Sequence, residues 1–162
     1  MTPTNLIQAL AAELKEATAQ IRLATEYHEP KEGGEPTFED CVAVNVFTQY
    51  LPQDLFENEH YYPCICAELI KISDDLKDGS SVEVALSFGV YAYEERAWRD
   101  LFHLMEVVRQ RILTKRVIAN RFRLTAAEWG LVEENLQPKP FYFGQGILTY
   151  QIYQPQEIGL PI

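Results

Sequence analysis

The sequence predicts an α+β domain in which a four-stranded, mainly antiparallel sheet is packed by two main helices. The clearest evidence is a change of apolar period between Ser81 and Ile112. Apolar residues alternate from Val82 to Val90, as on a strand with one buried face. Beyond Tyr93 they recur every three or four residues, as along the buried stripe of a helix. A strand therefore leads directly into a helix, and we expect that helix to cover the sheet.

Length and composition predict one domain spanning residues 1–162, because 47% hydrophobic residues suffice for a sizeable core. The sequence has no run of about 18 apolar residues and no basic start followed by an apolar core, so we expect a soluble cytosolic protein. The three cysteines are an odd number in a chain without an export signal. This count predicts reduced, partly buried thiols rather than a disulfide framework.

The first predicted element is a helix from Asn5 to Ala24, where apolar residues recur at spacings of three and four. Thr4, which follows Pro3, is the expected N-cap. Residues 27–40 then combine prolines and glycines with many acidic residues. Such a composition buries too little apolar surface to order itself, so we expect a mobile loop there.

Three strands are predicted before the second helix. Val42 to Leu51 is rich in β-branched and aromatic residues, which favour strands. Cys64 to Ile72 is a largely apolar run and is expected to be a more buried strand. Asp78 and Gly79 supply a turn that tolerates positive φ, so the third strand, Val82 to Ala92, is expected to return antiparallel to the second.

The second helix is predicted from Glu95 to Leu113, and its apolar spacing assigns Trp98 and Phe102 to the core. After it, residues 117–124 offer a short strand at most. The pattern over residues 126–136 is ambiguous between helix and strand.

The fourth main strand is predicted from Phe141 to Tyr153, with a bend or bulge at Gly144 and Gly146. The aromatic group at residues 141–143 fits either core or interface. Residues 154–162 contain two prolines and a glycine, and we expect a flexible C-terminal tail.

Charge is divided unevenly along the chain. The net charge of −10 argues against a general nucleic-acid binder, because phosphate repels an acidic surface. From Glu26 to Glu59 there are nine acidic residues and one lysine. From Arg96 to Arg123 there are eight basic residues and two acidic ones. The subunit is therefore expected to be electrically two-sided.

The sequence contains no recognisable catalytic constellation. The sequence has no Gly-rich phosphate loop, no nucleophile elbow and no zinc-protease helix motif. His28 and His60 fall in predicted polar loops, and His103 falls on the second helix beside Phe102 and Leu104. Each is expected to be solvated or packed rather than a general base. We therefore expect no enzymatic activity and no cofactor.

The sequence contains four possible zinc ligands, His60, Cys41, Cys64 and Cys66. Cys-x-Cys on a strand separates the two sulfur atoms by a full strand repeat, which is not the spacing of a zinc knuckle. Buried cysteines acting as small apolar residues are the better interpretation, and no metal is expected.

A cluster of basic residues near the end of the second helix has three interpretations. It could be a solvated helix end favoured by the macrodipole, a grip on nucleic acid, or a contact with the acidic region of another copy. We favour the last, because such a heterologous contact closes into a ring when the rotation permits. The candidate interface residues are Arg109, Arg111, Lys115, Arg116, Arg121 and Arg123 on the basic side and Glu35, Glu39, Asp40, Glu57 and Glu59 on the acidic side.

Several short motifs together suggest a family, over the region from Val42 to Tyr153. In chain order they are Tyr62-Pro63, Ser87-Phe88-Gly89-Val90-Tyr91, Trp98-Arg99-Asp100-Leu101, Arg111-Ile112-Leu113, Phe122 to Leu124, Trp129 and Pro140-Phe141-Tyr142-Phe143-Gly144. This pattern resembles the tail-terminator-like proteins (tail-completion or minor tail proteins) of long-tailed phages and prophages.

The resemblance implies a tail-terminator-like α+β fold whose sheet is backed by helices, and a structural role. It implies a homo-oligomeric ring, usually of six subunits, that caps the tail tube. The implied partners are the tail-tube protein and the head–tail connector protein. DNA would pass through the acidic ring without specific binding, and no membrane would be involved. The implied location is the tail or neck of the virion, after assembly in the bacterial host cytoplasm.

Two alternatives remain open beside this interpretation. The first is a head-closure or connector subunit from the same morphogenetic set. The second, from another class, is a nucleic-acid-binding accessory module that uses the patch from Arg109 to Arg123. A hydrolase is a distant third, and would require a histidine beside an acid and a hydroxyl or thiol.

Overall fold

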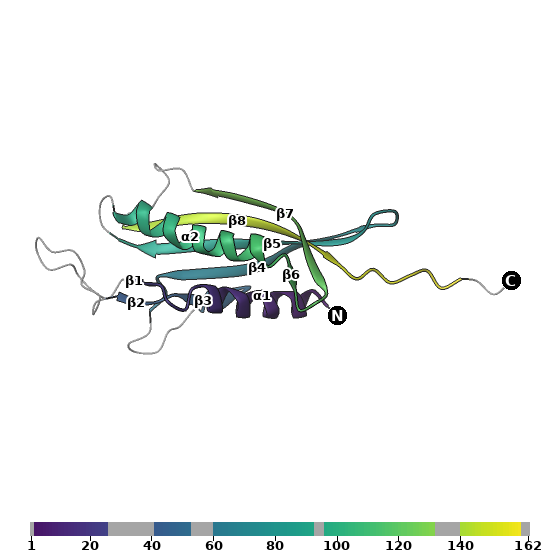
Figure 1. Cartoon of the computed structure of the whole chain (residues 1–162), viewed down its shortest axis with the longest axis horizontal. Coiled ribbons are helices and arrows are strands. Elements are labelled where there is room, and N and C mark those ends of the chain that lie inside the picture. Colours follow the sequence, from purple (N-terminus) through teal and green to yellow (C-terminus); the bar gives the residue numbers. More distant parts are fainter. Residues whose placement is uncertain (1, 26–40, 53–59, 93–95, 132–139, 160–162) are drawn as a thin grey trace, which may run out of the picture.

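The computed structural model describes residues 2–25, 41–52, 60–92, 96–131 and 140–159. Their elements are α1 (Pro3–Ala17), β1 (Arg22–Ala24), β2 (Cys41–Ala43), β3 (Asn45–Thr48), β4 (Cys64–Asp75), β5 (Gly79–Tyr91), α2 (Arg96–Thr114), β6 (Val117–Ile118), β7 (Phe122–Leu131) and β8 (Phe141–Ile152) (Figure 1). The strands form a six-stranded sheet in the order β3-β4-β5-β8-β7-β6 and a two-stranded sheet, β1-β2. The α+β class is confirmed, but the main sheet has six strands rather than the predicted four.

The first helix is shorter than predicted. α1 begins at Pro3, and its N-cap is Thr2 rather than Thr4. It ends at Ala17, since Thr18 leaves the helical conformation with φ −102° and ψ 5°. The predicted continuation to residue 24 is instead β1, which pairs antiparallel with β2. Because that partner comes from a distant part of the sequence, local spacing could not reveal the strand.

The predicted strand from Val42 to Leu51 is divided between the two sheets. Its first part, β2, pairs with β1, whereas β3 pairs parallel with β4. Beyond β3, Gln49 has a positive φ of 67°, and its side-chain amide takes over the pairing with β4. Its Oε1 accepts from the backbone nitrogen of Leu69 (3.0 Å), and its Nε2 donates to the Leu69 carbonyl (3.3 Å).

β4 and β5 form the antiparallel hairpin that the sequence predicts. At its tip the carboxylate of Asp75 accepts hydrogen bonds from the backbone nitrogens of Lys77 (2.7 Å) and Asp78 (3.0 Å). These bonds lower the pKa of the Asp75 carboxyl. Gly79 then adopts a φ of 96°, which confirms the expected turn residue.

The buried stripe of α2 is offset from the predicted one. Trp98 and Phe102, predicted to lie in the core, are 49% and 48% exposed. Successive residues of a helix point about 100° apart. Because Ala97 and Leu101 face the sheet, the residues that follow them, Trp98 and Phe102, are turned toward solvent. The two exposed rings pack edge to face with centroids 6.1 Å apart. The buried residues of α2 are Ala97, Leu101, Leu104, Met105, Val108 and Ile112.

The segment after α2 is a hairpin, where the sequence predicts a short strand at most within 117–124. β6 and β7 are joined through Ala119 and Asn120, which have positive φ values of 52° and 55°. Two such residues are typical of the tight turns that suit the twist of a hairpin. β7 continues to Leu131 against β8, so the ambiguous region from residue 126 is a strand as far as it is described.

β8 pairs with β5 without a register shift, so of the bend or bulge predicted at Gly144 and Gly146 the bulge is absent from this pair. The glycines instead make room for side chains on the helix side of the sheet. A Cβ atom on Gly146 would lie 2.8 Å from the ring of Trp129, and one on Gly144 would collide with Met105.

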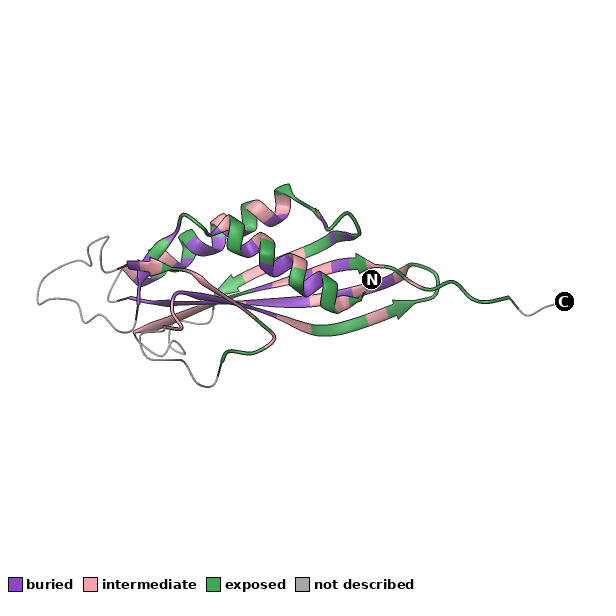
Figure 2. Cartoon of the chain, turned by 90° about the horizontal axis from the view of Figure 1, so that it is seen from below, coloured by how far each residue is buried: buried purple, intermediate pink, exposed green. Residues whose placement is uncertain are grey.

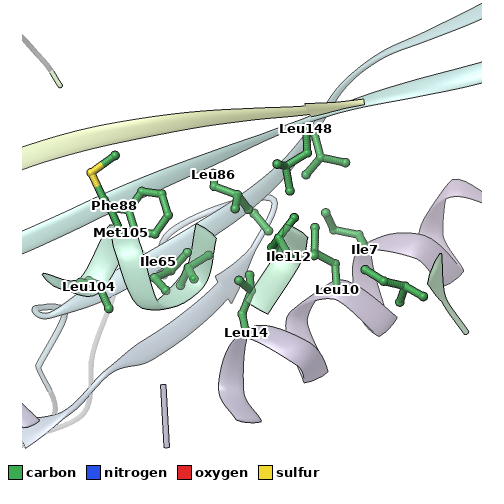
Figure 3. Close-up of a cluster of buried hydrophobic side chains, with 14 of the residues drawn as sticks. Ile7, Leu10, Leu14, Ile65, Leu86, Phe88, Leu104, Met105, Ile112 and Leu148 are labelled. Atoms are coloured by element: carbon green, nitrogen blue, oxygen red, sulfur yellow. The ribbon is translucent and has the colours of Figure 1, made fainter. Parts of the chain in front are cut away.

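Both helices lie on one face of the six-stranded sheet (Figure 2). α1 contacts β3 and β4, whereas α2 contacts β5 and β8. A single apolar cluster fills the space between, to which both helices and the central strands contribute (Figure 3). The described part of the chain places no helix on the other face.

Candidate subunit-interface site

The basic residues predicted as one interface have different environments in the structure. Arg111 of α2 lies between two acids of α1: its Nη2 is 3.0 Å from Glu13 Oε2 and 3.0 Å from Glu16 Oε1. Lys115, which directly follows the last residue of α2, also pairs with Glu13. Arg111 and Lys115 therefore bind α1 to α2 and are largely engaged within the chain.

Glu13 is the centre of this ion-pair group, and its side chain is only 12% exposed. Burial raises the pKa of the Glu13 carboxyl, but hydrogen bonds from Lys115 and Arg111 outweigh burial and lower the pKa overall. Hydrogen bonds to Glu16 and Glu13 raise the pKa of Arg111 in turn. This contact was not predicted from the sequence; its one sequence signal is the pair of acids three residues apart on α1, which share one helix face.

Two further basic residues have partners close in sequence. Arg109 pairs with Glu106 on the same helix, at 3.2 Å. Arg116 follows α2, and its Nε donates to the carbonyl of Leu113 at 3.0 Å. Arg109 is thus partly neutralised, whereas the charge of Arg116 has no acidic partner among the described residues.

Arg121 directly precedes β7 and Arg123 is its second residue, and together they form the most accessible basic surface among the candidate residues. Both are exposed, and within the described ranges neither forms a salt bridge. They line an open depression of about 650 Å³ beside the end of β8. Its other lining residues are Val117, Asn120, Phe122, Gln151, Ile152 and Tyr153.

The acidic half of the predicted interface lies outside the described residues. This applies to Glu35, Glu39, Asp40, Glu57 and Glu59, and to the mobile loop expected at residues 27–40. Pairing between these acids and the arginines of another copy therefore stays a prediction.

All three cysteines are buried thiols outside any disulfide, as the sequence predicts. Burial, together with the Glu68 carboxylate, whose Oε1 lies 3.7 Å from Sγ, raises the pKa of the Cys66 thiol to about 11. A thiol with this pKa is almost wholly protonated at neutral pH and reacts slowly as a nucleophile. Within the described residues no three His, Cys, Asp or Glu side chains are grouped as a metal site.

An aromatic cluster lies on the sheet face that carries no helix. The Tyr62 ring stands 4.8 Å from the ring of Phe141 and 6.0 Å from that of Phe143, measured between centroids. Tyr91 contacts Phe141 at 5.3 Å. A Cβ atom on Gly89 would lie 2.6 Å from Tyr62, so this glycine gives the ring its place. The aromatic residues at 141 and 143 therefore pack within the chain.

The outer part of β4 is more exposed than the sequence predicts. Ile70 and Ile72 are 53% and 54% exposed, and Leu76 at the hairpin tip is 93% exposed. We call these three residues the β4-edge surface. An apolar run predicts a strand whether or not another segment covers that strand. The exposure of the β4-edge surface therefore has no sequence signal of its own.

Comparison with known proteins does not identify a relative: no family model and no curated protein matches this chain. Neither described helix is both long and apolar enough to cross a membrane.

Proposed function

We propose that this chain is a structural subunit of a tail-terminator ring, which caps a phage tail tube and docks to the head–tail connector. In this role it would work in the neck of the virion, by joining copies of itself and neighbouring proteins. The ring would contain six subunits, as is usual in that family, and DNA would pass through it without specific binding.

The strongest support for the proposal is that three of the motifs on which the family resemblance depends lie together in the structure. Tyr62-Pro63, residues 87–91 and residues 140–144 are far apart in the sequence, yet they meet in the aromatic cluster. Tyr62 packs over Gly89 and against Phe141. The motifs therefore belong to one structural unit, as expected if they are inherited together.

The charges support assembly over nucleic-acid binding. Arg111 and Lys115 are held by acids of α1, so the continuous basic patch that a nucleic acid would need is reduced. Arg116, Arg121 and Arg123 remain for a partner. The acidic region between Glu26 and Glu59 of another copy offers complementary charge.

Electron microscopy of the purified protein, with and without tail-tube protein, tests the proposed function directly. We expect rings seated on tube ends and tubes of defined length. Free protein that leaves the tube ends bare and lets them keep growing would refute the proposal.

A second measurement separates the ring from a nucleic-acid module. The double variant Arg116→Glu, Arg121→Glu is compared with Lys15→Glu, which reverses an exposed charge on α1. We expect ring assembly to weaken in the double variant and to depend steeply on salt, with no binding of duplex DNA by the wild type. Duplex binding at low salt that only the double variant abolishes would favour the nucleic-acid module instead.

A further inference from the structure

The outer edge of β4 is only partly covered by its neighbouring strand. β3 pairs with residues 64–67, and the side chain of Gln49 covers Leu69. Past this point no described strand lies on the outer side of β4, so its backbone groups there lack a ladder partner. The β4-edge surface (Ile70, Ile72 and Leu76) lies along this open stretch. Proteins normally protect such apolar edges, because they readily pair with another strand.

A second unpartnered element leaves the molecule at the same end. Residues 153–159, here called the C-terminal arm, run away from the body beyond β8 in both views (Figures 1 and 2). Tyr153 and Ile158 are 69% and 92% exposed. Pro155 fixes its own φ and favours an extended residue before it, so the arm is already extended. The arm makes no backbone hydrogen bond to the described part of the chain.

We propose that the C-terminal arm of one copy adds as a strand to the open β4 edge of a second copy. Both elements have unused backbone hydrogen-bonding groups and exposed apolar side chains. Pairing would satisfy the backbone groups of each element and cover the apolar side chains of both. Addition of an extended segment to a free sheet edge is a common mode of peptide recognition. Pairing would use the arm after Pro155, which cannot donate, and would bring Ile158 against the β4-edge surface.

The arm is placed to reach another copy rather than its own β4. Gln154 Nε2 donates to the Asp75 carbonyl at 3.0 Å, which holds the root of the arm beside the hairpin tip. From there the arm continues outward, and it would have to reverse around the tip to reach Ile72 of the same chain. Because donor and acceptor differ, the contact closes into a dimer by reciprocal exchange or into a larger ring, or it forms an open chain of subunits. The arm–edge contact therefore deepens the proposed function. Its closure into a ring rests on that proposed function.

The test compares the full-length protein with an arm-deleted variant that ends at Ile152, the last residue of β8, and with an edge variant, Ile72→Glu with Leu76→Glu. Leu131→Glu is the matched control, since Leu131 is an exposed leucine on a different strand. Sedimentation velocity over a concentration series measures association. We expect at least tenfold weaker association in both variants and wild-type behaviour in the control. Unchanged thermal unfolding of the isolated variants shows that each one folds.

Mixing the two variants distinguishes arm exchange from other contacts. The edge variant keeps an arm and the arm-deleted variant keeps an edge, so one contact between them is intact. We expect the mixture to form a one-to-one dimer and nothing larger. A peptide of residues 153–159 should bind the arm-deleted variant and leave the edge variant unbound.

Three results would overturn the inference: wild-type protein that stays monomeric with no peptide binding, variants that associate like the wild type, or a mixture that stays monomeric. These outcomes are separate from those of the proposed function. Rings on tube ends that form equally well without the arm would reject arm exchange and leave the tail-terminator role intact.

Discussion

β5 and the outer part of β4 are neighbouring strands with similar side chains and opposite environments. Val82 and Leu86 of β5 are fully buried between the helices and the sheet. Ile72, which stands opposite Val82 in the register, is half exposed. The difference comes from what surrounds each strand, because β5 has strands on both sides and β4 loses β3 after a few residues. Apolar sequence makes both segments strands, and their neighbours decide which one belongs to the core.

The largest effect is expected from truncating the centre of β5. Phe88 is fully buried and packs against Trp129 with ring centroids 6.2 Å apart. Phe88→Ala should lower the free energy of unfolding by about 3–5 kcal/mol, through lost burial and the cavity left behind. Urea denaturation followed by tryptophan fluorescence measures the change. A loss below 1 kcal/mol would mean that β5 is not the centre of the core.

A smaller loss is expected from adding volume to β8, the other neighbour of β5. Gly146→Val would place a side chain where the Trp129 ring lies, and neighbouring atoms would have to shift. Overpacking of this kind should cost about 1–3 kcal/mol of unfolding free energy. Gly130→Val is the control, since a Cβ atom there meets no other atom within 4 Å. Equal losses from both substitutions would show that the cost is strand conformation rather than crowding.

The ion pairs between α1 and α2 should contribute less than the apolar core beneath them. Glu13→Gln removes the partner of both Arg111 and Lys115, and should cost about 1 kcal/mol. Glu16→Gln is the control, because among the described residues Glu16 forms a salt bridge with Arg111 alone and its side chain is 68% exposed. The same urea denaturation measures both variants, and a larger loss from Glu16→Gln would contradict the central place of Glu13.

The Glu13 contribution also has a defined pH dependence. Its pKa is lowered in the folded protein from the usual value of 4.5, so the folded state binds fewer protons than the unfolded state near that pH. The stabilisation is therefore complete above about pH 4.5 and is lost as pH falls through the lowered folded pKa. The difference between wild type and Glu13→Gln should stay constant from pH 7 to about pH 5 and shrink below it. A difference that grows on acidification would contradict this sign.

The smallest effect on stability is expected at the β4-edge surface. Leu76→Ala should change the free energy of unfolding of the monomer by less than about 0.5 kcal/mol, because a side chain that is 93% exposed loses little on truncation. Urea denaturation at low protein concentration measures this value. A clear loss would mean that Leu76 is covered within one copy, which would weaken the contrast with β5.

Periodicity was sufficient for elements whose partners are close in sequence. It predicted the β4–β5 hairpin, the turn at Gly79 and nearly the full length of α2, because each depends on local spacing and turn residues. It did not predict β1 or the division of β2 from β3, since both depend on pairing between distant segments. Trp98 and Phe102 were assigned to the core because they are aromatic residues at helical spacing, yet the small Ala97 faces the sheet.

The candidate site was less predictable than the fold. Counting charges identified Arg121 and Arg123, but it could not show that Arg111 and Lys115 are engaged by α1. Such pairing depends on the approach of two helices about a hundred residues apart in the chain. The open β4 edge also escaped the sequence, because exposure of a strand is a property of its surroundings.

The side-chain amide of Gln49 has a consequence beyond its two hydrogen bonds to Leu69. It ends the parallel ladder with a group that belongs to a side chain, and so it sets how many positions of β4 are left for an incoming strand. A residue without an amide at position 49 would shift this boundary while leaving the core untouched. The length of the acceptor site, and with it the register in which subunits could join, is thereby encoded in one glutamine.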